Sequence, residues 1–132
     1  MKKILSIQSS VTAGFVGNAV AGPVLLALGH HPMLINTISL AAHPGYGERA
    51  GGPPDDLLFS GHLQGLLKLH GVDDIASVMS GYLGSSGQIC PHRRGCDCLA
   101  GRDERQGALY TRPRDGRFGT LIYHTRAGRR HA

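Results

Sequence analysis

Three polar turns, each directly after a candidate strand, hold the residues of this chain best suited to meet a small ligand. They are residues 9–18 (SSVTAGFVGN), 39–46 (SLAAHPGY) and 80–86 (SGYLGSS). Ligands of parallel α/β sheets bind at the carboxyl ends of the strands, so turns in these positions would share one site. Ordinary loop chemistry explains the same pattern, because a fold does not by itself fix a function.

The elements that must position these turns alternate between strand and helix. Apolar runs predict strands at residues 3–8, 32–37 and 75–79. Near-helical spacing predicts a helix over residues 18–28, although Pro23 weakens its first turn, and Gly29 stops it. Residues 41–54 are rich in glycine and proline and predict a loop or flap.

A second helix is predicted after the flap. Two prolines and then Asp55 and Asp56 suit a helix start, because acids are favoured at the positive end of the helix dipole. Gly71 ends this helix. Its leucines predict one broad apolar face, made of Leu57, Leu58, Leu63, Leu66, Leu67 and Leu69. The order β-α-β-flap-α-β predicts an α/β fold with a parallel sheet and right-handed crossovers.

The composition of the 132-residue chain changes near residue 90. Residues 1–89 contain four basic and five acidic residues, a balance of −1, whereas residues 90–132 contain ten arginines and four acids, a balance of +6. All three cysteines lie in the second part. The chain therefore divides into an α/β part, residues 1–89, and an Arg/Gly/Cys-rich tail, residues 90–132, predicted to be irregular.

No apolar run reaches the roughly 18 residues of a membrane span, so no membrane partner is expected. The apolar stretch after Met1-Lys2-Lys3 stops at Gln8, too short for a signal peptide. We therefore expect a cytoplasmic protein without disulfides.

The residues of the three turns resemble successive motifs of the pyridoxal kinases, members of the ribokinase-like superfamily. The matching stretches are ILSIQSSVTAGFVGNA, INTISLAAHPGYG and MSGYLGS, and the resemblance runs from about residue 3 to residue 88. It implies a truncated ribokinase-like sheet flanked by helices. The reaction it implies is transfer of a phosphoryl group from ATP, assisted by Mg²⁺, to the 5′-hydroxymethyl of pyridoxal.

The resemblance also implies site residues. Ser9 matches the serine that contacts the pyridoxal ring, and Gly14, Gly17 and Asn18 match a structural turn. In the second motif the family often has Asn-His-Thr, with the threonine near the substrate. Here the stretch is Ala42-His43-Pro44, followed by Gly45, and a proline has no N–H to donate.

Tyr82 matches a tyrosine beside the substrate in the third motif, and a half-buried tyrosine at a strand end would look the same. The family's catalytic aspartate lies in a later Gly-rich motif that these 132 residues do not contain. We therefore expect an inactive fragment with no catalytic residue, no metal site and no bound ATP or Mg²⁺. The intact family is usually homodimeric.

The tail has the composition of a GC-rich gene translated out of frame. A shifted frame is obtained by joining the last two bases of each codon to the first base of the next. The genetic code then allows only a few residues at some positions of the shifted product. Tyr110-Thr111 then permits only Ile or Thr, and Asp115-Gly116 only Met or Thr. Residues 108–124 permit LYILDPVMGDSGRLYI, which resembles the family motif LDPVMGD. We hypothesise a one-base frameshift near residues 88–90.

Two alternative interpretations of the tail receive little support. A zinc site would use Cys90, His92, Cys96 and Cys98, but their spacing does not match the usual cysteine pairs. A nucleic-acid arm would use the arginines, but no aromatic platform or known motif accompanies them. Two other function classes remain open: a hydroxymethylpyrimidine or sugar kinase fragment, and a non-enzymatic basic protein that binds nucleic acid.

Overall fold

The described residues form one mixed sheet with a helix on each face. The computed structural model describes residues 1–47, 50–70, 75–88, 109–110 and 121–124. Among them, the sheet has six strands in the order β3-β2-β1-β4-β6-β5. The strands are β1 (Lys3–Ala13), β2 (His31–Ala42), β3 (Gly51–Gly52), β4 (Ile75–Ser80), β5 (Leu109–Tyr110) and β6 (Leu121–His124).

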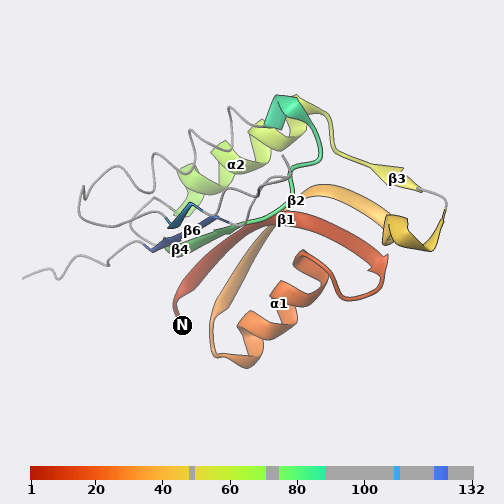
Figure 1. The fold of residues 1–132 in the computed structure, drawn as a ribbon. Coiled ribbons are helices and arrows are strands. Elements are labelled where there is room, and N and C mark those ends of the chain that lie inside the picture. Colours follow the sequence, from red (N-terminus) through yellow and green to blue (C-terminus); the bar gives the residue numbers. More distant parts are fainter. Residues whose placement is uncertain (48–49, 71–74, 89–108, 111–120, 125–132) are drawn as a thin grey trace, which may run out of the picture.

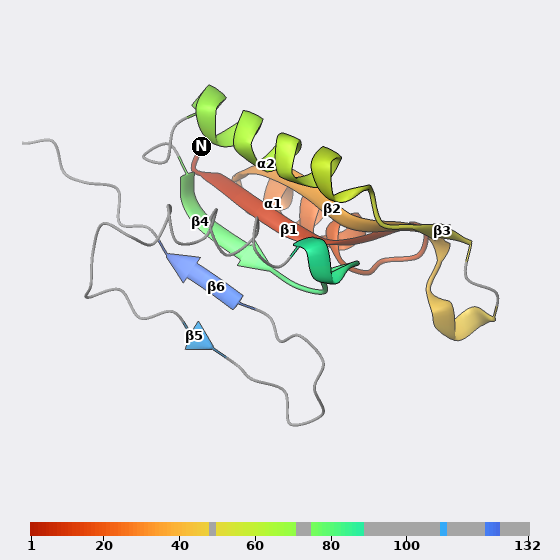
Figure 2. The same cartoon turned by 90° about the horizontal axis from the view of Figure 1, so that it is seen from above.

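The centre of the sheet is parallel, as predicted. β1 pairs in parallel with β2 on one side and with β4 on the other. β3 pairs antiparallel with β2, and β6 pairs antiparallel with β4 (Figure 2). β3 can run antiparallel because only a short flap separates it from β2, whereas a parallel neighbour requires a crossover of a dozen or more residues.

Both long strands extend beyond their predicted ends. β1 continues through Ala13 and β2 through Ala42, paired from Ser10↔Ser39 to Ala13↔Ala42. The prediction of polar turns starting at Ser9 and Ser39 was therefore wrong by several residues. Hydrogen bonds between β1 and β2, together with the β-branched Val11 and Thr12, favour a continued strand there more than the polar serines favour a turn. As a consequence, the turn and the flap begin at the far tips of two paired strands.

The helices α1 (Asn18–Ala27) and α2 (Asp56–His70) cover opposite faces of the sheet (Figure 1). On the α1 face, Ala21 and Leu25 are buried. Gly22 approaches β2 so closely that an added Cβ would lie 3.0 Å from Leu34 Cδ1. Small residues thus let α1 lie directly on the strands.

The main apolar core lies between α2 and the sheet. Phe59 is fully buried, and Leu63 one turn later is almost so; both pack on side chains of the three central strands, Leu5, Ile7, Met33, Ile35, Ile75 and Val78. Leu66 and Leu67 extend this face. The predicted leucine face was wrong for Leu57, Leu58 and Leu69, which are exposed. The i, i+4, i+7, i+8 spacing from Phe59 defines the buried stripe.

Asp55 supports the start of α2, as its position predicted. Its Oδ1 accepts a hydrogen bond from the Leu58 backbone N–H at 2.8 Å.

A second, smaller core of Val11, Ile38 and Leu40 lies at the far tips of β1 and β2. Neither α1 nor α2 combines the length and the hydropathy of a membrane-crossing helix, nor does any other helix within the described residues.

The tail contributes only β5 and β6 to the described structure. The cysteines and His92 of the considered zinc site lie outside the described residues, as do the ten arginines.

Candidate functional site

The turn that follows β1 is a tight glycine turn pressed against its own strand. Gly14 and Gly17 both have positive φ, 129° and 55°. A Cβ at position 17 would overlap the Ser9 carbonyl oxygen and would lie 2.7 Å from Ser9 Oγ. Ser10 and Gly17 form an isolated antiparallel bridge. Val16, between the two glycines, packs on the small core of Val11, Ile38 and Leu40.

The flap that follows β2 forms the opposite wall. Its residues Pro44–Tyr46 make a single 3₁₀ turn, η1. The Gly45 backbone N–H donates to His43 Nδ1 at 3.0 Å, and the Tyr46 N–H donates to the His43 carbonyl at 2.9 Å. The Gly47 N–H donates to the Pro44 carbonyl at 3.3 Å. These internal bonds hold the flap in one shape.

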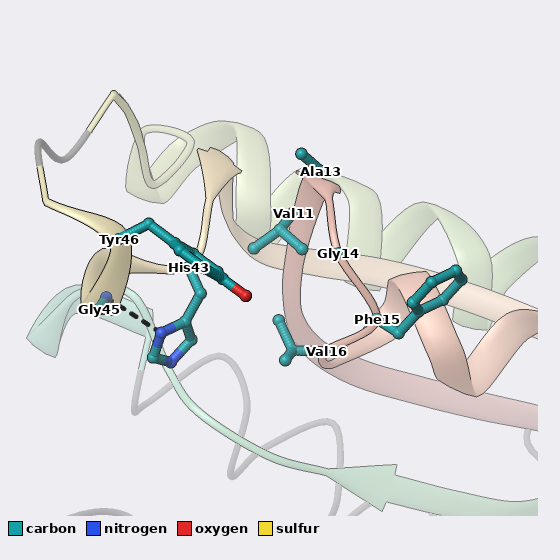
Figure 3. Close-up of a pocket in the computed structure, with 8 residues that line it drawn as sticks. All are labelled: Val11, Ala13, Gly14, Phe15, Val16, His43, Gly45 and Tyr46. Carbon is teal, nitrogen blue, oxygen red and sulfur yellow. Dashed lines mark hydrogen bonds between the residues drawn. The ribbon is translucent and has the colours of Figure 1, made fainter.

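An open hollow of about 420 Å³ lies between the turn and the flap. The turn side contributes Val11, Ala13, Gly14, Phe15 and Val16, and the flap side contributes His43, Gly45 and Tyr46. Figure 3 shows the Tyr46 side chain extending from the flap toward Val11 and Val16, and the His43 ring lying beside Gly45, to which it is hydrogen-bonded. The hollow thus joins the first two sequence motifs, which lie about thirty residues apart.

On the flap side, the polar chemistry of the hollow comes from side chains, because the flap uses its backbone donors internally. Pro44 has no N–H, and the N–H groups of residues 45–47 are bonded within the flap. His43 Nδ1 accepts a hydrogen bond, so a neutral imidazole carries its proton on Nε2. His43 and Tyr46 are therefore the lining residues that bring polar side chains beside the apolar walls. That combination suits a flat, largely apolar ring with an oxygen acceptor.

Beneath the turn, a buried polar network connects α1 to both strands. Asn18, 3 % exposed, accepts a hydrogen bond from Ser6 Oγ at 2.8 Å. Its Nδ2 donates to the Ile35 carbonyl at 3.0 Å and to Asn36 Oδ1 at 2.8 Å. Gln8 Nε2 donates to Ser6 Oγ at 2.8 Å.

The third motif is fastened to β2 rather than to the hollow. Thr37 Oγ1 donates to the Tyr82 carbonyl at 2.6 Å, and Gln88 Nε2 donates to the Thr37 carbonyl at 2.8 Å. Gln88 Oε1 accepts the Gly84 N–H at 2.9 Å. Tyr82 itself is about half exposed and does not line the hollow.

The predicted site residues therefore fall into two groups. Gly14, His43 and Gly45 line the hollow. The others do not: Ser9 and Gly17 form the base of the turn, Asn18 lies beneath it, and Pro44 and Tyr82 lie outside the lining.

Sequence reasoning did not identify Val11, Phe15 and Val16 as wall residues. Phe15 is 83 % exposed, and a large apolar side chain inside a glycine-rich turn could have signalled a ligand-facing role. The described residues contain no group of three His, Cys, Asp or Glu side chains able to hold a metal ion.

No protein-family model matches the chain. A pyridoxine/pyridoxal/pyridoxamine kinase of Bordetella avium is 39 % identical over 85 residues, which are 64 % of this chain and 29 % of that protein. The pyridoxal kinase PdxY of Burkholderia thailandensis is 35 % identical over 88 residues, 67 % of this chain and 31 % of that protein. The chain thus spans about a third of the length of the curated relatives it matches.

The similar solved structures are also pyridoxal kinases. A pyridoxal kinase from Leishmania donovani, in complex with ADP and pyridoxamine, superposes with a TM-score of 0.69 at 33 % identity, covering 76 % of this chain and 35 % of that one. A pyridoxal kinase from Entamoeba histolytica gives 0.72 at 26 % identity, covering 77 % and 37 %. These relatives and structural neighbours are pyridoxal kinases, and the similarity covers the N-terminal part of this chain.

Proposed function

We propose that this chain is the N-terminal part of a pyridoxal kinase and that its hollow is part of the vitamer-binding site. The observation that carries the proposal is the convergence of the first two motifs on one hollow with apolar walls and fixed donors. The intact enzyme would transfer the γ-phosphoryl group of ATP to the 5′-hydroxymethyl of a pyridoxal-type substrate. The Leishmania donovani neighbour, solved with ADP and pyridoxamine, supports this assignment.

Each wall has a distinct role in this proposal. Val11 and Val16 contact the faces of the pyridine ring, and His43 donates from Nε2 to an oxygen substituent. Ser9 lies at the base of the turn beside Gly17 and is the polar contact to the ring that the resemblance implies. Tyr82 would approach the substrate only from the rim, since its backbone is fastened to Thr37.

The residues that the structure describes do not account for nucleotide chemistry. ATP supplies the phosphoryl group and Mg²⁺ offsets its charge in phosphoryl transfer generally. The described residues provide no donor set for a metal ion, so we derive no step through either group. We propose that residues 1–89 supply the vitamer side of the site and that residues 90–132 are an out-of-frame tail. A cytoplasmic location and a homodimeric intact enzyme remain predictions.

Binding of pyridoxine to the purified 132-residue chain tests the vitamer site. Pyridoxine is an alcohol and forms no imine with lysine, so calorimetry reports noncovalent binding alone. We expect His43→Ala to weaken binding about fivefold to tenfold, the loss of roughly one hydrogen bond. The matched control is His62→Ala, an exposed histidine on α2. Equal binding by both variants, or none by the unmodified chain, would contradict the proposal.

Two further assays separate the alternatives. The 132-residue chain should show no pyridoxal-dependent ATP turnover, and measurable turnover would contradict its assignment as an inactive fragment. A substrate panel on the frame-restored protein distinguishes pyridoxal from hydroxymethylpyrimidine and sugars. Pro44 makes this panel informative, because it stands where the family often has a substrate-facing threonine.

A further inference from the structure

We infer that Asn18 is a positioning residue that sets the distance between the two walls of the hollow. The inference rests on the proposed function for its ligand but on the geometry of the described residues for its mechanism. Asn18 follows the turn that carries Phe15 and Val16, and its side chain reaches both strands whose tips carry the walls.

The hydrogen-bond directions in the network fix the amide in one orientation. Gln8 Nε2 donates to Ser6 Oγ, so the Ser6 hydroxyl is free to donate its own proton to Asn18 Oδ1. The two Asn18 amide hydrogens then point to the Ile35 carbonyl and to Asn36 Oδ1. The Gln8 carbonyl, at 3.4 Å, is the longest contact. A chain of donors thus runs from β1 through Asn18 to β2.

The position of this network along the sheet explains its effect. β1 and β2 pair regularly up to Gln8↔Asn36, and the next pair is Ser10↔Ser39, so β2 contains one extra residue. Asn18 binds both strands at the last regular pair before this irregularity. Beyond it, β1 leads to the turn and β2 leads to the flap. Asn18 therefore holds the strands together where the ladder is interrupted, immediately before the walls of the hollow.

Asn18 does not act as a helix cap, which is the common role of asparagine at a helix start. The N-cap of α1 is Gly17, and no side chain caps the helix. Asn18 is the first helical residue, and its amide points into the sheet instead of toward the free N–H groups of α1. A buried amide with all its groups bonded specifies one arrangement of the segments that it joins.

The test compares Asn18→Ala with Leu25→Ala, a core variant of the same helix, in the full chain. Two quantities are measured: amide hydrogen exchange of residues 14–17, and pyridoxine affinity. We expect Asn18→Ala to raise exchange in the turn at least tenfold and to weaken pyridoxine binding about tenfold. Leu25→Ala, compared at matched global stability, should change neither by more than about twofold.

A turn that exchanges equally in both variants would overturn the inference, even if pyridoxine binding is lost. Conversely, if the unmodified chain does not bind pyridoxine, the proposed function fails while the exchange data still decide the role of Asn18. If Asn18→Ala does not fold, Asn36→Ala replaces it, because Asn36 is exposed and supplies a single acceptor. That variant should raise exchange in the turn about threefold, and unchanged exchange would overturn the inference.

Discussion

Gly17 lies against Ser9 with no room for a side chain between them: a Cβ at position 17 would overlap the Ser9 carbonyl oxygen. The same glycine has φ of 55°, which L-residues rarely adopt. Steric exclusion and backbone conformation therefore both require glycine here. This contact fixes the turn that forms one wall of the hollow.

Gly17→Ala should destabilise the chain by about 2–4 kcal/mol, because the strain of positive φ adds to displacement of Ser9. Urea unfolding followed by circular dichroism measures the change. The control is Gly61→Ala on α2, where an added Cβ meets nothing within 4 Å. Alanine is the better helix former, so the control should gain about 0.5–1 kcal/mol. Equal effects of the two substitutions would contradict the packing described at Gly17.

Sequence patterns predicted the central elements because those depend on local preference and apolar spacing. The order of strands and helices and the parallel centre of the sheet are confirmed. The strand ends were wrong because pairing between β1 and β2, a nonlocal property, carries polar residues such as Ser10 into the ladder. The buried stripe of α2 was misjudged because Phe59 anchors it, and leucine content alone does not identify the buried side.

The candidate site was predictable only in part, for the same reason. Motif residues His43 and Gly45 line the hollow. The network around Asn18 depends on Ser6 and Asn36, which come together only when β1, β2 and α1 pack. No local spacing encodes that meeting. Tyr82 matches a motif, yet its backbone is fastened to Thr37, forty-five residues earlier, and this contact sets its place.

Phe59→Ala should cost about 3–5 kcal/mol, since a fully buried aromatic ring leaves a cavity at the centre of the main core. In a domain this small, such a loss is comparable to the whole free energy of unfolding. Leu57→Ala, two residues earlier and 86 % exposed, should change stability by less than about 0.5 kcal/mol. Both are measured by urea unfolding. A large loss from Leu57→Ala would show that α2 presents a different face.

Pro44→Thr should move affinity and stability in opposite directions. Pro44 does not itself line the hollow but stands between two residues that do, His43 and Gly45. Threonine adds a hydroxyl and an N–H at this position, so pyridoxine should bind about twofold to tenfold more tightly. Loss of the proline ring frees the unfolded chain and should lower stability by about 0.4–1 kcal/mol. Calorimetry and urea unfolding report the two effects. Pro54→Thr, at a position not adjacent to any lining residue, should lower stability without changing affinity; equal affinity in both variants would contradict a substrate contact at position 44.

Gln88→Leu should destabilise the chain by about 2–5 kcal/mol, because it leaves one buried and one partly buried backbone group without their Gln88 partners. Gln88 is fully buried, and its amide pairs with the Thr37 carbonyl and the Gly84 N–H. The exposed Gln64 on α2 provides the control, and Gln64→Leu should change stability by less than about 0.5 kcal/mol. Urea unfolding measures both variants. Similar small effects would mean that Gln88 is not integrated into the fold.

The proposed one-base frameshift near residues 88–90 makes a prediction about the gene. Sequencing of the gene across residues 85–95 tests this, together with expression of the frame-restored product. Restoration should produce the LDPVMGD-like motif and pyridoxal-dependent ATP turnover; an intact gene whose shifted frame encodes nothing similar to the kinases would refute the frameshift.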